Sequence, residues 1–340
     1  MIVFSQNNNN NRNLVVPFKY LQSSRHQIKK SSTLNRSWSH YNKSLINRGD
    51  MTIWLSQDVI DQWYEKNRVY DGTGTPNLYS DMAIFTIHEI RQVFKLPLRQ
   101  CEGLINSLFK LMKIDLQSPS YSVLSKRLKK LNLSRPFYRK SHCYNKDIKA
   151  IAIDSSGLKC FGHEEWHIHK YQIQEKKAYK KLHIAVDNHH IIQNVELTNS
   201  HIQDQSIVKK LINPIEEKIK HVTADGAYDN NPTYKTITKK FPSADVVIPP
   251  KKGAVDNKEN EFFRNRNILE IKYHGHMEWQ KRREYGKRNN SELAIQRYKK
   301  ILGNKLHARD FERQKQETII GCSILNKMMC LTIGENRSKF

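Results

Sequence analysis

Apolar residues recur at a spacing of about 3.6 residues through the first half of the chain, from Met51 to about Lys146. This period is typical of amphipathic helices that bury one face. Ser and Pro residues at the starts of these segments are helix-capping signals. The pattern predicts helices over 56–64, from a cap at Ser80 to a break at Leu96-Pro97, over 99–114, and from a cap at Ser118 with Pro119 at the helix start to Leu131.

The pattern changes at Ile148, where short runs of Ile, Val and Ala replace the helical spacing. Such runs between turn residues are typical of buried strands. Strands are predicted over 148–154, 181–187, 191–197, 221–225 and 244–248, and helices over 204–215, 231–240, 288–302 and 310–331. The stretch 257–283 is polar and receives no assignment. The expected fold class is therefore α/β, a mixed sheet preceded by an all-helical region.

Charge indicates a partner for the helical region. The 340 residues carry 58 Lys and Arg against 33 Asp and Glu, a net charge of +25. A charge of this size favours a nucleic-acid partner, although it can also serve solubility alone. Residues 38–146 then fit a helix-turn-helix-like DNA-binding region, and a plain helical bundle fits them equally well. On the first interpretation the basic residues of its last helix contact DNA, namely Lys126, Arg127, Lys129 and Lys130.

Other features narrow the class of protein. The apolar stretch 319–333 is short and interrupted by Lys327, so we expect no membrane span. The start of the chain shows no secretory signal. The five cysteines form no C-x-x-C pair, which argues for a reducing cytoplasm and against a disulfide framework or a thiolate zinc site. Residues 1–37 are expected to be a weakly ordered basic leader.

Two acids occupy equivalent places in the predicted sheet. Asp154 ends the first predicted strand and Asp225 ends the fourth, and Gly157 and Gly226 follow them closely. Carboxylates at the carboxyl ends of neighbouring strands converge on the crevice where α/β sheets bind ligands. An Asp at a strand end can also be a simple turn residue.

A third acid lies on a predicted helix. On a helical wheel started at Tyr285, Arg288, Glu292 and Lys299 fall within an arc of about 60°. One helix face would thus present a carboxylate flanked by two cations and a phenol. A solvated i,i+4 pair between Arg288 and Glu292 would give the same spacing.

The three carboxylates together suggest metal chemistry. Carboxylate oxygens are the ligands that Mg²⁺ and Mn²⁺ prefer. Two such ions, about 3.5–4 Å apart, can activate an attacking oxygen and stabilise the leaving oxygen in phosphodiester displacement.

These residues resemble the DDE transposases of bacterial insertion sequences, and most closely insertion-sequence family five. That group carries the signature Tyr285-x2-Arg288-x3-Glu292-x6-Lys299. Further blocks agree in the same order, namely Asp154-Ser-Ser-Gly-Leu-Lys159, Tyr179-Lys-Lys-Leu-His-Ile-Ala-Val-Asp187, Ala224-Asp-Gly-Ala-Tyr-Asp229 and Ile248-Pro-Pro-Lys-Lys-Gly-Ala254. The resemblance extends over roughly residues 38–330.

The resemblance implies an RNase H-like catalytic domain over 147–305, followed by a C-terminal helix and tail over 306–340. It implies two Mg²⁺ ions, replaceable by Mn²⁺, at Asp154, Asp225 and Glu292, with Tyr285, Arg288 and Lys299 near the DNA. Recognition of terminal inverted repeats and cut-and-paste insertion into target DNA would follow.

We expect the active complex to pair two DNA ends and therefore to be at least a dimer, in the bacterial cytoplasm and associated with the nucleoid. A catalytically inactive DNA-binding repressor, or a nuclease that cuts without joining, would have a similar sequence.

Overall fold

The computed structural model describes residues 38–66, 76–137, 148–160 and 179–335. The chain divides into two compact units, residues 1–43 and 44–340. Helix α1 (Trp38–Asn47) contains the described part of the first unit. The leader expected over 1–37 lies outside the described residues.

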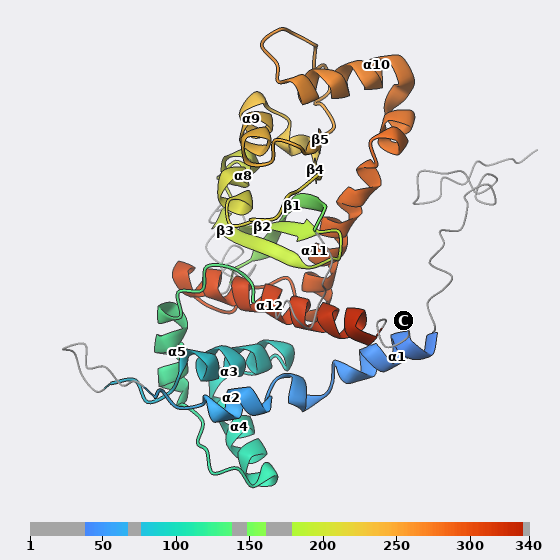
Figure 1. The fold of residues 1–340 in the computed structure, drawn as a ribbon. Helices are drawn as coiled ribbons and strands as arrows, with labels where there is room; N and C mark the ends of the chain where they lie inside the picture. Colours follow the sequence, from blue (N-terminus) through green and yellow to red (C-terminus); the bar gives the residue numbers. More distant parts are fainter. Residues whose placement is uncertain (1–37, 67–75, 138–147, 161–178, 336–340) are drawn as a thin grey trace, which may run out of the picture. The chain divides into compact units, whose positions relative to one another are not determined.

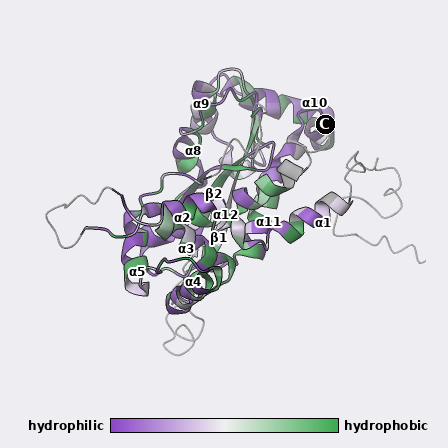
Figure 2. Cartoon of the chain, turned by 60° about the horizontal axis from the view of Figure 1, so that its bottom comes forward, coloured by the Kyte–Doolittle hydropathy of each residue, from purple (hydrophilic) through white to green (hydrophobic). Residues whose placement is uncertain are grey.

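The helical region has the elements that the apolar spacing predicts. After η3 (Met51–Ile53) come α2 (Gln57–Asp61), α3 (Asp81–Val93), α4 (Leu98–Met112) and α5 (Tyr121–Lys130). The Ser80 hydroxyl accepts a hydrogen bond from the Ala83 N–H at 3.1 Å, as expected of the cap. The cap of α5 is Ser120, not Ser118 as predicted, and Pro119 therefore precedes the helix. In Figure 2, α4 and α5 carry both apolar (green) and polar (purple) residues.

Five strands form one mixed sheet in the order β3-β2-β1-β4-β5. They are β1 (Ala150–Lys159), β2 (Tyr179–Asp187), β3 (Ile192–Asn199), β4 (His221–Ala224) and β5 (Asp245–Val247). The first three form an antiparallel meander, and β4 and β5 are parallel to β1. The α/β fold class is confirmed, and this arrangement is consistent with the RNase H-like fold that the resemblance implies.

Helices cover both faces of the sheet (Figure 1). Helices α8 (Asp204–Ile212) and α9 (Asn231–Lys240) pack on one face against residues such as Ile151, Ile153 and Val222. Helices α11 (Asn289–Ile301) and α12 (Phe311–Glu335) cover the other face, and α12 also contacts α3 and α5. One apolar core therefore joins this face of the sheet to the helical region.

The polar stretch without an assignment contains a long helix, α10 (Phe262–Arg282), bent at Gly275. Gly275 has φ 78°, a backbone conformation that favours glycine. Two further 3₁₀ turns are η4 (Gly226–Tyr228), which follows β4, and η5 (Tyr285–Arg288), which precedes α11. None of the helices in the described part of the chain has the length and apolar character needed to cross a membrane.

The described cysteines differ from one another. Cys101, Cys160 and Cys322 are buried and unpaired. Cys330 is disulfide-bonded, which the scattered spacing of the cysteines did not predict.

Candidate active site

Asp154 and Asp225 lie next to each other across two parallel strands. The ladder between β1 and β4 ends at the pair Ile153 and Ala224, so each acid is the next residue along. Neighbouring strands are about 4.8 Å apart, which places the two backbones side by side. Asp225, predicted to be the last residue of the fourth strand, directly follows β4. Asp154 lies inside a longer strand than predicted, at the point where the pairing of β1 with β4 stops.

The alternation of side chains along β1 decides which way Asp154 points. Ile153 packs into the core beneath α8 and α9. The next side chain must point to the opposite face, where α11 lies. There the Arg288 Nη1 atom is 3.6 Å from the Asp154 Oδ2 atom.

Arg288 joins the third acid to the other two. Its Nη2 atom forms an ion pair with Glu292, one turn along the chain. The guanidinium also lies over the Tyr285 ring, 5.5 Å from the ring centre. A single cation thus contacts both Asp154 and Glu292, and the solvated i,i+4 pair weighed from the sequence is one half of this bridge.

Each of the two aspartates accepts a hydrogen bond from the N–H of the next residue. The Asp154 Oδ1 atom accepts the Ser155 N–H at 2.8 Å, and the Asp225 Oδ1 atom accepts the Gly226 N–H at 2.7 Å. At Gly226 a Cβ atom would meet the Pro249 carbonyl oxygen at 3.2 Å, so glycine suits this close approach. Each of these backbone bonds engages only the Oδ1 atom of its carboxylate.

The surroundings of Asp154 disfavour its charge. Burial raises the pKa of Asp154 to about 6, and the nearby Asp225 and Glu292 carboxylates act in the same direction. The Ser155 N–H and the Arg288 guanidinium oppose this rise. The cluster therefore has more negative charge than its single bridging arginine neutralises.

This donor set fits a divalent cation in its chemistry, because three carboxylates gather around one positive group. Within the described residues, no three His, Cys, Asp or Glu side chains converge closely enough to enclose a metal ion. Arg288 lies between Asp154 and Glu292 in this arrangement.

The position of Tyr285 in the structure differs from the position that the helical wheel predicts. It belongs to the 3₁₀ turn η5 rather than to α11, so one continuous wheel does not describe the signature. Its side chain is buried against Trp279, at 5.2 Å between ring centres, and its hydroxyl points to the Ala224 carbonyl at 3.5 Å. Tyr285 thus supports the turn that carries Arg288, and its burial argues against the expected contact with DNA.

Lys299 lies two turns beyond Glu292 in α11 and is half-buried. Seven residues correspond to nearly two full turns, so both side chains leave the helix on one side. The prediction that Lys299 contacts DNA agrees with this placement.

The four basic residues of α5 that are predicted to contact DNA differ in their exposure to solvent. Lys126, Lys129 and Lys130 are exposed on α5. Arg127 is 7% exposed, forms an ion pair with Asp81 and donates to the Tyr79 carbonyl at 3.0 Å. Its guanidinium thus links α5 to α3, and this burial disfavours the predicted contact of Arg127 with DNA.

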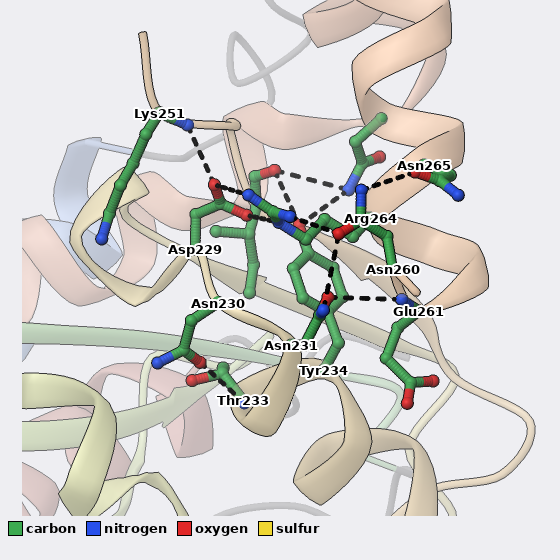
Figure 3. Close-up of polar contacts among 12 residues, drawn as sticks. Asp229, Asn230, Asn231, Thr233, Tyr234, Lys251, Asn260, Glu261, Arg264 and Asn265 are labelled. Carbon is green, nitrogen blue, oxygen red and sulfur yellow. Dashed lines mark hydrogen bonds and ion pairs between the residues drawn. The ribbon is translucent and has the colours of Figure 1, made fainter. Parts of the chain in front are cut away.

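A second polar network lies just beyond Asp225 (Figure 3). The Asp229 carboxylate is fully buried and accepts two hydrogen bonds from Arg264, at 2.8 and 3.2 Å, and one from the Lys251 N–H at 3.0 Å. Arg264 also donates to Asn260 at 2.6 Å. This network ties the segment after β4 to the start of α10, the helix that leads to Tyr285 and Arg288.

A fourth acid, which the sequence analysis did not predict, lies beside the cluster. Asp204 at the start of α8 accepts from the Ser155 hydroxyl at 2.8 Å and from Lys181 at 2.9 Å. An acidic residue in the first turn of a helix is common, so the sequence contained no specific signal for this contact.

Comparisons with known proteins identify the family of this chain. Two family models, each described as a transposase DDE domain, match residues 46–163 and residues 145–327. Among solved structures, the chain is similar to the piggyBac transposase in a synaptic complex with hairpin DNA. That match has 10% sequence identity and a TM-score of 0.37, and it covers 86% of this chain and 75% of that chain. DDE transposase domains generally use divalent metal ions. Because the second family model spans more than half of the sequence, the chain belongs to the transposase DDE domain family.

Proposed function

We propose that this transposase acts on a bacterial insertion sequence of the type its signature resembles, family five. It would bind the terminal inverted repeats, cut the DNA at the element ends and join the freed ends to target DNA. One observation carries the proposal: Asp154 and Asp225 directly follow the last residue pair between two adjacent parallel strands, and Arg288 connects Asp154 to Glu292.

Asp154, Asp225 and Glu292 would hold two Mg²⁺ ions, and Mn²⁺ would substitute because it prefers the same oxygen ligands. When bound, the ions supply activation of the attacking oxygen and stabilisation of the leaving oxygen. Arg288 must then leave at least one of its two carboxylate partners, because it occupies the space between them. A guanidinium released in this way suits a DNA phosphate, which it can bind through two parallel hydrogen bonds.

The remaining predicted contacts divide between two regions. Lys299 would hold the strand near the cleaved phosphate, together with Arg288. The exposed Lys126, Lys129 and Lys130 of α5 would contact the inverted repeat. Since two element ends must be held together, the active complex would contain at least two copies of the chain. It would act on nucleoid DNA in the bacterial cytoplasm.

A strand-transfer assay tests the proposal. The protein is incubated with labelled terminal-repeat DNA, a target plasmid and Mg²⁺, beside the variant Asp225→Asn. The matched control is Asp256→Asn, which changes an exposed acid outside the cluster. We expect joined products from the wild-type protein and the control, and none from Asp225→Asn. Cleavage without joining would indicate a nuclease, and binding without either product would indicate a repressor.

The variant Glu292→Gln separates catalysis from binding. It should abolish cutting and leave the binding of terminal-repeat DNA nearly unchanged in gel-shift titrations. Retained cutting would remove Glu292 from the metal-binding set.

A further inference from the structure

Asp204 connects two strands from behind the active site. Its carboxylate is 16% exposed, lies at the start of α8, and has partners on both β1 and β2. The Ser155 hydroxyl donates to its Oδ2 atom at 2.8 Å, and Lys181 forms an ion pair with its Oδ1 atom at 2.9 Å. Lys181 also donates to the Ile202 carbonyl at 2.9 Å, which fixes the ammonium beside the helix start.

Ser155 is the residue after Asp154, and the two side chains leave β1 on opposite faces. Asp154 points toward Arg288 at the end of η5, whereas Ser155 points toward Asp204 on α8. The peptide between them supplies the N–H that the Asp154 Oδ1 atom accepts at 2.8 Å. A hydrogen bond on the rear face therefore fixes the same peptide that orients the carboxylate on the front face.

The position of this peptide along β1 makes such support necessary. The pairing of β1 with β4 ends at Ile153, whereas the pairing with β2 continues through Ser155 and His183. Between Ile153 and Lys159, where β1 forms a parallel bridge with Lys305, the described residues place a neighbouring strand on one side of β1 only. A strand with one free side has less restraint on its backbone, unless a side chain anchors it.

We propose that Asp204 is a positioning residue, which directs the Asp154 carboxylate toward the metal site by holding Ser155. This inference rests on the proposed function, because it assumes that Asp154 binds metal. Lys181 neutralises Asp204 and thereby keeps this fourth acid from competing for the cation. Residues that orient a metal ligand in this way typically change metal affinity by about 10- to 100-fold when they are removed.

Titration of Mn²⁺ against the DNA-free protein, followed by the EPR signal of the unbound ion, tests this role. Asp204→Ala and Ser155→Ala should each weaken Mn²⁺ binding by about 10- to 100-fold. Because both changes break the same hydrogen bond, the double variant should bind no more weakly than the weaker single variant. Ser155→Thr keeps the hydroxyl on a β-branched residue that suits a strand, and it should retain wild-type affinity.

Two further variants separate the possible failures. Asp154→Asn should abolish Mn²⁺ binding, and if it does not, the proposed metal site is wrong. Asp81→Ala removes an ion pair in the helical region and should leave Mn²⁺ affinity unchanged.

If Asp154→Asn abolishes binding while Asp204→Ala and Ser155→Ala bind Mn²⁺ as the wild type does, the positioning role is overturned. A lowered melting temperature with unchanged affinity would show that the Asp204 contacts serve stability alone. Ser155→Ala keeps the test decisive if Asp204→Ala does not fold.

Discussion

Two groups of aspartate and arginine lie near the same end of the sheet, and they are built differently. Asp229 is fully buried, and Arg264 and the Lys251 N–H together supply donors to both of its oxygens. Asp154 and Glu292 share the single guanidinium of Arg288. Beside them, Asp225 is exposed and accepts the N–H of its neighbour.

The difference shows how similar residues serve stability in one place and chemistry in another. Where the donors match the carboxylate, as at Asp229, the charge is compensated inside the protein. Where two carboxylates share one arginine beside a third, burial and mutual repulsion raise the pKa of Asp154. The negative charge that Arg288 does not compensate favours the binding of a cation. Perturbed pKa values of this kind are common at functional sites.

The largest expected effect on stability is at Asp229. Asp229→Ala leaves Arg264 and the Lys251 N–H without their shared acceptor, and should lower the free energy of unfolding by about 3–5 kcal/mol. Urea denaturation monitored by circular dichroism measures this. Asp256→Asn provides the matched control and should stay within about 0.5 kcal/mol of wild type. If Asp229→Ala lowers the free energy of unfolding by less than about 1 kcal/mol, the Asp229 group does not stabilise the fold as this comparison requires.

Asp154→Asn should raise the free energy of unfolding of the metal-free protein at high pH, whereas Asp229→Ala lowers it. The folded-state pKa of about 6 exceeds the ordinary value of 3.8 for an aspartate, so the folded state binds the proton more tightly. Stability therefore falls as pH rises from about 4 to about 6, by up to about 3 kcal/mol. The variant lacks this loss, and should be more stable than wild type at pH 8 and similar at pH 4. Urea titrations in EDTA at both pH values measure the difference, and equal stabilities at pH 8 would contradict it.

A smaller effect is expected at Arg288. In metal-free protein, Arg288→Ala removes the cation shared by Asp154 and Glu292, and should cost about 1.5–3 kcal/mol at pH 8. Saturating Mn²⁺ should reverse most of this loss, because it neutralises the same carboxylates. Thermal unfolding with and without Mn²⁺ measures both the loss of stability and its recovery. A loss that persists in saturating Mn²⁺ would indicate that Arg288 serves folding alone.

The smallest effect on stability is expected at Lys299, where the change should appear in DNA binding. Lys299→Ala should leave the free energy of unfolding within about 0.5 kcal/mol of wild type. It should also reduce the slope of log affinity against log salt by about 1, since one phosphate contact is lost. Fluorescence anisotropy with labelled terminal-repeat DNA at several salt concentrations gives the slope. An unchanged slope would remove Lys299 from the DNA contacts.

The sheet and its two aspartates follow closely from the sequence. Buried apolar runs predict strands well, and the two acids that end such runs lie where the pairing of β1 with β4 stops. The extension of β1 to Lys159 was not predicted, because the residues after Asp154 are small and polar. Their pairing with β2 depends on tertiary contacts that local spacing does not encode.

The burial of Arg127 could have been predicted from the spacing of apolar residues in α5, but the run of basic residues favoured an exposed position. Leu124, Arg127, Leu128 and Leu131 follow the i, i+3, i+4, i+7 spacing of a buried helix face. The run of basic residues suggested an exposed surface, whereas the period places Arg127 inward. There Asp81 compensates its charge.

Helix α10 had no comparable signal. Its buried residues are Asn267, Ile268 and Trp279, which form no apolar stripe, and Gly275 interrupts the period. Asn267 is held by hydrogen bonds to the Val246 carbonyl and to the Trp279 indole. Polar contacts of this kind are invisible to a hydropathy pattern.

Helix α12 also determines the order in which the protein can be completed during synthesis. It packs on β3 and on α3 and α5, so the helical region shares its core with residues 311–335. The ribosome makes these residues nearly two hundred positions after α5, a delay of about 10–40 s at typical elongation rates. Throughout this interval the apolar face of the helical region lacks its partner, and a transcript that stops before α12 would yield a chain exposed to chaperones and proteases.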